Sequence, residues 1–317
     1  MPVEQPRNPA DFIVPLAIGR LEGRMLHIPA AAPVSEAPES TRPAPEILFV
    51  YGHHSSLERW WGLMEVLSKY GSVTMPDLPG FGGMDSFYTL GQKPTIDAMA
   101  DYLAAFIKWR YKRKKVTIVG MSFGFVVATR MFQRYPELTK RVTMFISLAG
   151  FAHKDDFILK KRTYTFYLNS ARLLQHRLPA FIFKATCLNP LVLRAAYRLS
   201  HNEKFKDADP ARFKQLIDVE VRLWRDNDVR TAMKTSADFL VLDNCRQTVD
   251  LPVYHIGVVG DRYFDNTVVE QHLRIIFSDF TLLATLDLVS HAPSVIATAE
   301  EAAAFIPESL DKLLREL

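Results

Sequence analysis

The chain has 317 residues, which is too long for one small domain and too short for three. Hydrophobic residues make up 48% and charged residues 23%, an ordinary globular composition that excludes a disordered or low-complexity protein. Lys and Arg number 39 against 35 Asp and Glu, so the net charge is only +4. This mild excess falls short of a dedicated nucleic-acid-binding protein, and we expect no nucleic-acid partner.

The cysteines and the apolar runs indicate a soluble protein of the cytoplasm. Cys187 and Cys245 are too few for a disulfide framework, so we expect two buried thiols in a reducing compartment. The first 25 residues carry several charges and no apolar core of signal-peptide length. The longest uncharged apolar run, residues 116–129, is 14 residues long, which is shorter than a membrane span. We therefore expect no stable membrane insertion, and the oligomeric state stays open.

In chain order, the predicted elements begin as an alternation of strands and helices. Residues 30–45, rich in Pro and Ala, predict an exposed irregular connection. Apolar runs predict strands at 12–18, 25–28, 47–51, 72–75, 116–119 and 142–148. Helical spacing predicts helices at 57–69, 96–111 and 123–135. Strands with little polar alternation, separated by helices, are typical of a parallel sheet covered on both faces.

The alternation stops near residue 152 and resumes near residue 249. Between them we expect helices at 164–178, 191–199, 210–224 and 229–242. After this segment we expect strands at 253–259 and 281–286, and helices at 267–276 and 296–317, the last bent at Pro307. The prediction is an α/β core of residues 1–151 and 249–317, with a helical cap of residues 152–248 inserted after the sixth strand.

A serine stands between a predicted buried strand and the helix that follows it, in the motif Gly120-Met121-Ser122-Phe123-Gly124. The pattern GxSxG is typical of a nucleophile on a tight strand-to-helix turn, where larger side chains at the glycine positions would collide. At the start of the helix, the backbone N–H of Phe123 can meet a developing oxyanion. The alternative interpretation is an ordinary tight turn.

Five segments together resemble the serine-nucleophile branch of the α/β-hydrolase superfamily, in the family's order. They are Tyr51-Gly52-His53, the glycine-rich run at 76–83, the Ser122 turn, the Asp261 turn and Ser290-His291-Ala292-Pro293. The resemblance covers roughly residues 45–151 and 250–317. It implies an esterase-like or lipase-like fold with a mostly parallel sheet, flanking helices and a helical cap. Two positions depart from the family: Tyr51 replaces a usual His, and Phe125 replaces a frequent second Gly.

A serine hydroxyl needs a base, and the base needs a carboxylate that fixes its tautomer. The resemblance implies that the base is His291, in a loop after the last predicted strand. The order of serine, acid and histidine along the chain agrees with this assignment. His255 in a predicted strand and His272 in a predicted helix are expected to be packing or surface residues.

The acid is expected at Asp261, at the end of a strand. This residue stands nine positions after Pro252 and 30 positions before His291, a separation that leaves room for one helix and one strand. Other carboxylates remain as alternatives. They are Asp265 on the same loop, and Asp155 and Asp156 after the sixth strand.

The second oxyanion donor is expected in the loop after the third strand. The backbone N–H of His53 matches the family position, and His54 is next in line. The two imidazoles could suggest a metal, but no third ligand stands at a suitable spacing, so we expect none. The glycine-rich run at 77–83 lacks the Lys-Ser/Thr of a phosphate loop, and we expect a surface loop beside the mouth of the active site.

The predicted cap is rich in aromatic residues, which indicates an apolar pocket. We therefore predict a serine hydrolase that cleaves small to medium carboxylic esters, or lactones, through an acyl-enzyme and without a cofactor. Ser122 is the nucleophile, His291 the base and Asp261 the acid. The alternatives are a carbon–carbon bond hydrolase of the same fold and a non-catalytic ligand-binding member.

The basic excess lies in the predicted cap. Residues 153–250 contain 18 Lys and Arg against 12 Asp and Glu, which leaves the rest of the chain slightly acidic. Such a cationic cap is expected to attract anionic substrates or lipid surfaces to the mouth of the site.

Overall fold

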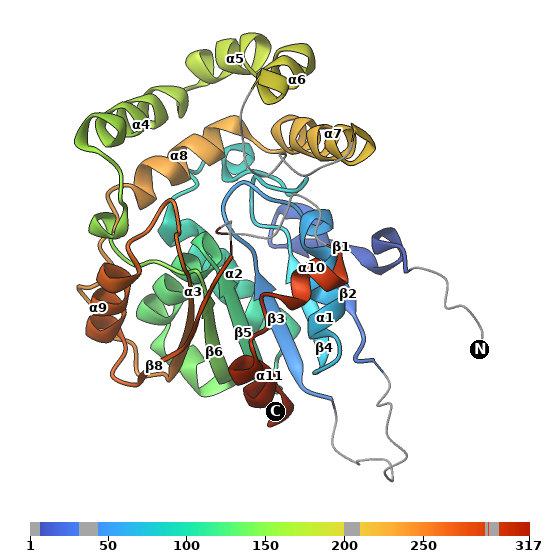
Figure 1. Ribbon diagram of the computed structural model, residues 1–317, viewed down its shortest axis with the longest axis vertical. Helices are drawn as coiled ribbons and strands as arrows, with labels where there is room; N and C mark the ends of the chain where they lie inside the picture. Colours follow the sequence, from blue (N-terminus) through green and yellow to red (C-terminus); the bar gives the residue numbers. More distant parts are fainter. Residues whose placement is uncertain (1–6, 32–43, 200–209, 289–290, 292–297) are drawn as a thin grey trace.

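The computed structural model describes residues 7–31, 44–199, 210–288, 291 and 298–317, and one eight-stranded sheet forms its centre (Figure 1). The strands are β1 (Ile13–Ile18), β2 (Leu21–Ile28), β3 (Glu46–Val50), β4 (Ser72–Pro76), β5 (Val116–Met121), β6 (Val142–Leu148), β7 (Val253–Val258) and β8 (Phe280–Leu286). Their order is β1-β2-β4-β3-β5-β6-β7-β8. The hairpin β1–β2 pairs antiparallel with β4, and β3 to β8 run parallel to one another. The predicted mostly parallel sheet is confirmed.

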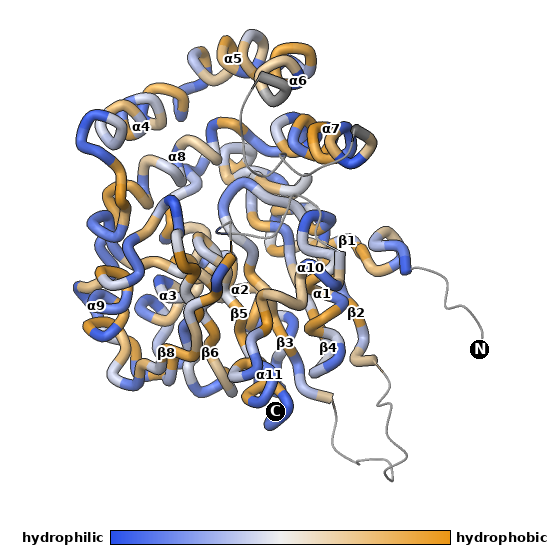
Figure 2. The backbone as a smooth tube through the Cα atoms, viewed as in Figure 1, coloured by the Kyte–Doolittle hydropathy of each residue, from blue (hydrophilic) through white to orange (hydrophobic). Residues whose placement is uncertain are grey.

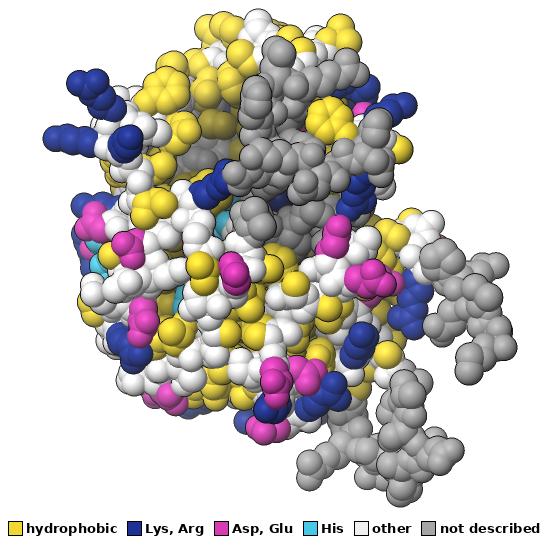
Figure 3. Space-filling view, viewed as in Figure 1, with side chains coloured by type: hydrophobic (Ala, Val, Ile, Leu, Met, Phe, Trp, Pro, Cys, Tyr) yellow, Lys and Arg dark blue, Asp and Glu magenta, His cyan; other side chains and the backbone are white. Residues whose placement is uncertain are grey.

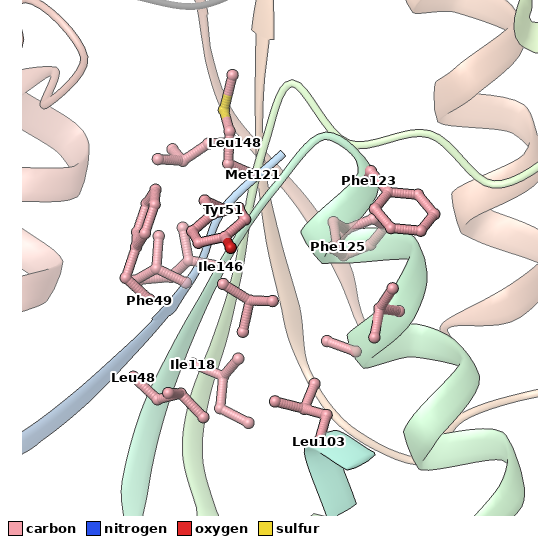
Figure 4. Packing of buried hydrophobic residues seen from close by; sticks show 14 of the residues in the cluster. Leu48, Phe49, Tyr51, Leu103, Ile118, Met121, Phe123, Phe125, Ile146 and Leu148 are labelled. Carbon is pink, nitrogen blue, oxygen red and sulfur yellow. The ribbon is translucent and has the colours of Figure 1, made fainter. Parts of the chain in front are cut away.

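The central strands are covered on both faces, which explains their continuous apolar sequences. Every residue of β3 and of β5 is buried. Leu48 of β3 stands opposite Ile118 of β5 in the parallel register, and Figure 4 shows both among the buried hydrophobic residues at these strands. The sheet therefore forms a rigid base below the carboxyl ends of β3 and β5, where the Ser122 turn and the His53 loop begin.

Helices flank the sheet (Figure 1). They are α1 (Trp61–Leu67), α2 (Ile96–Arg110), α3 (Phe123–Arg134), α9 (Asn266–Ile276), α10 (Ala299–Ala303) and α11 (Glu308–Arg315). Helix α2 packs against α3, and α1 packs against α10. The helix predicted at 57–69 is a short 3-10 turn, η2 (Leu57–Trp60), followed by α1. The last predicted helix is two helices, because Pro307 is the N-cap of α11; residues 296 and 297 lie outside the described residues.

In the part of the chain that the structure describes, five α-helices lie between β6 and β7, at the end of the molecule beyond the carboxyl ends of the strands (Figure 1). They are α4 (Lys161–Leu174), α5 (Arg177–Thr186), α6 (Pro190–Leu199), α7 (Pro210–Asp226) and α8 (Val229–Phe239). Helix α8 lies against the core, where Ala232 is fully buried, and α4 packs on α8. We call these five helices the cap.

Two expectations about this segment are wrong. The sequence predicts one helix over 164–178, whereas α4 ends at Leu174 and α5 begins at Arg177, with His176 as its N-cap. The thiol of Cys187, directly after α5, is exposed rather than buried, and Cys245 is half-buried. Cys187 is exposed because α5 makes few contacts with the rest of the protein and buries only Ala180.

Candidate active site

Ser122 occupies the sharp turn between β5 and α3. Its backbone has φ 50° and ψ −115°, a left-handed conformation that costs a non-glycine residue about 1–3 kcal/mol. Both motif glycines are required by close packing. A Cβ at Gly124 would lie 2.0 Å from the carbonyl oxygen of Val50, and one at Gly120 would lie 2.7 Å from Cα of Phe125. The turn therefore holds the Ser122 side chain above the ends of β3 and β5.

The structure brings Ser122, His291 and Asp261 together in one hydrogen-bonded row. Nε2 of His291 lies 2.9 Å from Oγ of Ser122, and Nδ1 of His291 lies 2.5 Å from Oδ2 of Asp261. A carboxylate only accepts, so Nδ1 carries the proton and Nε2 is left to accept one from the serine hydroxyl. The other residues of the segment Ser290-His291-Ala292-Pro293 lie outside the described residues.

The Asp261 carboxylate is fixed from two sides. Its Oδ1 accepts hydrogen bonds from the backbone N–H groups of Tyr263 at 2.8 Å and Phe264 at 3.3 Å, while Oδ2 faces His291. Only 2% of the Asp261 side chain is exposed. Hydrogen bonds of this kind, with an anionic acceptor, are strong and hold a carboxylate in a single orientation. Asp261 is therefore set to orient the imidazole of His291.

The alternative acids are engaged elsewhere. Asp265 is the N-cap of α9 and accepts from the backbone N–H groups of Thr267 and Val268. Asp156 is fully buried and bonds Nδ1 of His272 at 2.5 Å, and the side chain of Asp155 is 67% exposed. Sequence reasoning left these three residues open, and the structure joins only Asp261 to His291 and Ser122.

The loop after β3 lies beside Ser122. A Cβ at Gly52 would stand 3.5 Å from Cβ of Ser122, so the backbone of His53 follows within a short distance. Phe123 is the first residue of α3, where a backbone N–H has no acceptor within its own helix. The two predicted oxyanion donors therefore come from adjacent strand ends, β3 and β5.

The side chain of His53 has a role that the sequence did not indicate. Its Nε2 lies 2.8 Å from Oγ1 of Thr235 and 3.1 Å from the carbonyl oxygen of Ala232, both on α8. Burial lowers the pKa of His53 to about 4, so the imidazole is neutral. Nε2 donates its proton to these oxygens, because a carbonyl only accepts. His53 thus connects the predicted oxyanion loop to the cap.

His54 points to a different part of the cap. Its Nδ1 lies 3.2 Å from Nδ2 of Asn227, and its ring centroid lies 4.0 Å from that of Trp224. Burial lowers the pKa of His54 to about 3. Within the described ranges, no group of three His, Cys, Asp or Glu side chains is arranged to hold a metal ion.

The glycine-rich run at 77–83 is not the surface loop that we expected. Leu78 and Phe81 are fully buried, and only Gly83 of this run is exposed. The N–H of Gly82 donates to Oδ1 of Asn227 at 2.7 Å, and the N–H of Asp228 donates to the carbonyl oxygen of Gly80 at 2.8 Å. The loop is buried because the junction of α7 and α8 covers it, a long-range contact without a local sequence signal.

The two departures from the family pattern are packing features. Tyr51 is fully buried, and its hydroxyl donates to Oδ1 of Asp77 at 3.0 Å and accepts from the N–H of Leu78 at 2.7 Å. Burial raises the pKa of Tyr51 and of Asp77 well above their ordinary values. Phe125 stacks on Phe145 with 4.9 Å between the ring centroids. Neither residue removes a group from the Ser122 site.

Aromatic rings surround the site on the side of the cap. Phe239 of α8 lies 5.1 Å from the ring of His53 and 5.9 Å from that of Phe157. Phe264 lies 4.8 Å from Phe157 and 5.2 Å from His291. This row, which we call the aromatic wall, runs from the predicted oxyanion loop to His291, the predicted base. An apolar wall excludes water and strengthens the hydrogen bonds beside it.

Comparison with known proteins agrees with this architecture. A family model described as "alpha/beta hydrolase fold" matches residues 45–271. An epoxide hydrolase mutant from Vigna radiata has a similar structure (TM-score 0.66, 13% identity, 96% of this chain and 98% of that chain covered). So does a thermophilic esterase from Thermogutta terrifontis (TM-score 0.59, 16% identity, 96% and 97% covered).

One similarity is local. A stretch of 99 residues, 31% of this chain, is 30% identical to Protein ABHD8 of Homo sapiens. This match spans only 22% of the length of that curated relative.

Proposed function

The chain belongs to the α/β-hydrolase family, and on that premise we propose that it is a serine hydrolase acting on small to medium carboxylic esters or lactones. The row formed by Ser122, His291 and Asp261 carries this proposal. A serine between a strand and a helix, bonded to a histidine whose other nitrogen meets a buried carboxylate, is the arrangement of an activated nucleophile.

In the proposed reaction, Oγ of Ser122 attacks the carbonyl carbon of the ester, and Nε2 of His291 takes the hydroxyl proton. Asp261 stabilises the imidazolium that forms. The backbone N–H groups of Phe123 and His53 bind the oxyanion of the tetrahedral intermediate. His291 then gives its proton to the leaving alcohol, and the acyl group remains on Ser122.

The second half of the reaction uses the same residues. His291 takes a proton from a water molecule that attacks the acyl carbon, and returns it to Oγ as the acid departs. Every proton moves between Ser122, His291, the leaving group and water. The proposed mechanism therefore needs no cofactor or metal ion.

The aromatic wall supports an apolar substrate group. Phe239 and Phe157 offer ring faces and edges but no charge, which suits an acyl chain, a lactone ring or an aromatic ester better than a peptide or a sugar. A hydrophobic surface distinguishes acyl groups weakly, by about 10–200-fold per methylene. We therefore expect a graded preference for chain length rather than strict specificity.

A fluorophosphonate probe tests the nucleophile directly. We expect the probe to modify Ser122, with the modified peptide identified by mass spectrometry, and Ser122→Ala to abolish both labelling and hydrolysis of nitrophenyl esters. Ser147→Ala is the matched control, because Ser147 is a buried serine bonded to His255. Hydrolysis that persists in Ser122→Ala would exclude the proposed mechanism.

A substrate screen separates the proposed chemistry from its alternatives. Nitrophenyl esters of increasing chain length and a series of lactones should turn over with a burst of the first product. Release of a chromophoric dienoate from a vinylogous diketone, without ester turnover, would instead indicate carbon–carbon bond hydrolysis. Tight binding of small esters without turnover would indicate a ligand-binding protein.

A further inference from the structure

The first part of the cap has an extreme charge composition. Residues 157–202 contain no Asp or Glu, but eight Lys and Arg residues. These are Lys160, Lys161, Arg162, Arg172, Arg177, Lys184, Arg194 and Arg198. Arg194 pairs with Asp218 of α7 at 2.8 Å, and Lys184 donates to the carbonyl oxygen of Arg225. The cations at 160–162, 172 and 177 are exposed, and none has a carboxylate of the described residues within 4.0 Å.

The same helices expose large hydrophobic side chains. Sixteen such side chains are exposed in the described chain, and eight of them lie in α4, α5 and α6. They are Phe166, Tyr167, Leu173, Leu178, Phe181, Ile182, Leu191 and Val192, with exposed fractions from 48% to 78%. Figure 3 shows hydrophobic side chains gathered over this end of the molecule, with Lys and Arg beside them. We call this surface the outer cap face.

The orientation of α5 explains this exposure. Leu178, Phe181 and Ile182 are spaced by three and four residues and so share one side of the helix. The buried residue of α5 is the small Ala180, on the opposite side. Figure 2 shows hydrophobic stretches in α5 and α6 at this outer end. The apolar side of α5 therefore faces away from the core, the reverse of an ordinary surface helix.

The helices of the outer cap face are short. No single helix in the described ranges is long and apolar enough to cross a bilayer. Helix α5 (Arg177–Thr186) and the first part of α6 (Pro190–Ala196) reach the necessary length and hydrophobicity only when they are taken together, and a bend of 67° separates them. Two short, bent, apolar helices flanked by cations have the composition of segments that lie in the plane of a membrane surface.

We propose that the outer cap face docks on an anionic lipid surface. Phe166, Leu178, Phe181 and Leu191 enter the boundary between headgroups and acyl chains, while the exposed cations contact lipid phosphates and carboxylates. The positive charge of the outer cap face favours an anionic lipid surface over the other partners that an apolar face could bind. In a symmetric dimer through this face, two copies of segment 157–202, each with eight Lys and Arg and no Asp or Glu, would repel each other. The phosphates of a nucleic acid would pair with the cations, but the apolar side chains would stay exposed to water.

The docking is independent of catalysis, because no residue of the outer cap face belongs to the Ser122 site. The proposal is therefore tested by measuring how tightly the full chain binds to lipid vesicles that can be sedimented. One set contains phosphatidylcholine alone, and the other contains phosphatidylcholine mixed with phosphatidylserine. We expect binding at least about tenfold tighter to the phosphatidylserine vesicles, weakening as salt rises.

Two double variants separate the apolar and the charged contributions. Leu178→Ser with Phe181→Ser should lower binding to phosphatidylserine vesicles by at least about tenfold, because two inserted side chains are lost. Lys161→Glu with Arg162→Glu should remove most of the preference for phosphatidylserine. All four residues are exposed, so thermal unfolding should stay unchanged.

Matched controls lie on the core. Trp109 is 46% exposed on α2, and Lys112 and Arg113 are exposed just after that helix. Trp109→Ser, and Lys112→Glu with Arg113→Glu, should bind vesicles like the wild type. The proposal is overturned if these variants lose as much binding as the cap variants, or if the wild type binds neither vesicle. It is also overturned if the chain forms a dimer that Leu178→Ser with Phe181→Ser dissociates.

Discussion

Two histidine–aspartate pairs among the described residues share the same short distance from Nδ1 to a carboxylate oxygen, but only one of them meets a serine. Nδ1 lies 2.5 Å from a carboxylate oxygen both in His291–Asp261 and in His272–Asp156. The first pair lies between the end of β7 and the loop after β8, and the free nitrogen of His291 reaches Ser122. The pair alone therefore does not make a catalytic site.

The second pair has a structural use. Asp156 also accepts hydrogen bonds from the backbone N–H groups of Ala152 and His153, and so its carboxylate organises the entrance to the cap. His272 lies within α9, and its ring centroid is 4.5 Å from that of His153. This pair fixes the start of the cap on α9, whereas the first pair leaves one nitrogen free for chemistry.

Removing each histidine is the strongest test of this comparison. His291→Ala should lower kcat for a nitrophenyl ester by about 10⁴-fold or more, because Ser122 loses its proposed base. His272→Ala should leave kcat of the folded protein within about threefold and lower its thermal stability. Both are measured by steady-state kinetics and thermal unfolding. Equal losses of kcat in the two variants would mean that the pairs are not functionally different.

Substitutions of the two aspartates should differ in the same way, one affecting kcat and the other affecting stability. Asp261→Asn should lower kcat by about 10³–10⁴-fold, because the amide no longer holds His291 in the required tautomer. Asp156→Asn should lower the free energy of unfolding by about 1–3 kcal/mol, because a buried acceptor of three hydrogen bonds is altered.

Asp265→Asn is the matched control for the acid, since Asn caps a helix about as well as Asp. Its kcat and its thermal stability should be close to those of the wild type. A large loss of kcat in this variant, with activity retained in Asp261→Asn, would identify Asp265 rather than Asp261 as the acid.

A third histidine, His53, contacts the cap rather than an acid. His53→Ala should lower kcat by about 10–100-fold, because the loop that carries the proposed oxyanion donor loses its anchor on α8. Thr235→Val removes one acceptor of the imidazole and keeps the histidine, and we expect a smaller loss in the same direction. An unchanged kcat in both variants would show that the loop holds its position without α8.

The smallest expected effect concerns His255, which is bonded to Ser147 at 2.8 Å but faces no acid. Burial lowers the pKa of His255 from 6.5 to about 4. Between these two values the unfolded chain binds more protons than the folded chain, so stability falls as pH falls from 6.5 to about 4. Thermal unfolding across this range should show a smaller slope for His255→Gln, and an identical slope would contradict this account.

The core elements could be predicted from the sequence because their local patterns agree with their surroundings. The apolar run of β5 and the glycines around Ser122 signal a buried strand and a close turn, and the structure contains both. The convergence of Asp261 and His291 on Ser122 was predicted through the resemblance to a known family. Spacing along the chain alone left Asp265, Asp155 and Asp156 open.

The cap was harder to predict because its helices bury little. In α5 only Ala180 is buried, so the spacing of its hydrophobic residues does not indicate which side faces the protein. The break itself, Gln175 and His176, contains no Gly or Pro, and the nearest proline, Pro179, stands in the first turn of α5. The burial of the glycine-rich loop depends on Asn227, about 145 positions further along the chain. The anchor between His53 and Thr235 spans 182 positions, and no local pattern encodes such contacts.

The contacts of α8 have a consequence for building chimeras of this protein. The chain enters the cap where the N–H of Ile158 donates to the carbonyl oxygen of Tyr263, and between α7 and α8 Asn227 and Asp228 bond the glycine-rich loop. The residues that follow, in α8, anchor His53 beside the nucleophile. A graft from another hydrolase should therefore exchange residues 159–226 and keep α8 with its host, because exchanging α8 as well would replace part of the support of the proposed oxyanion loop.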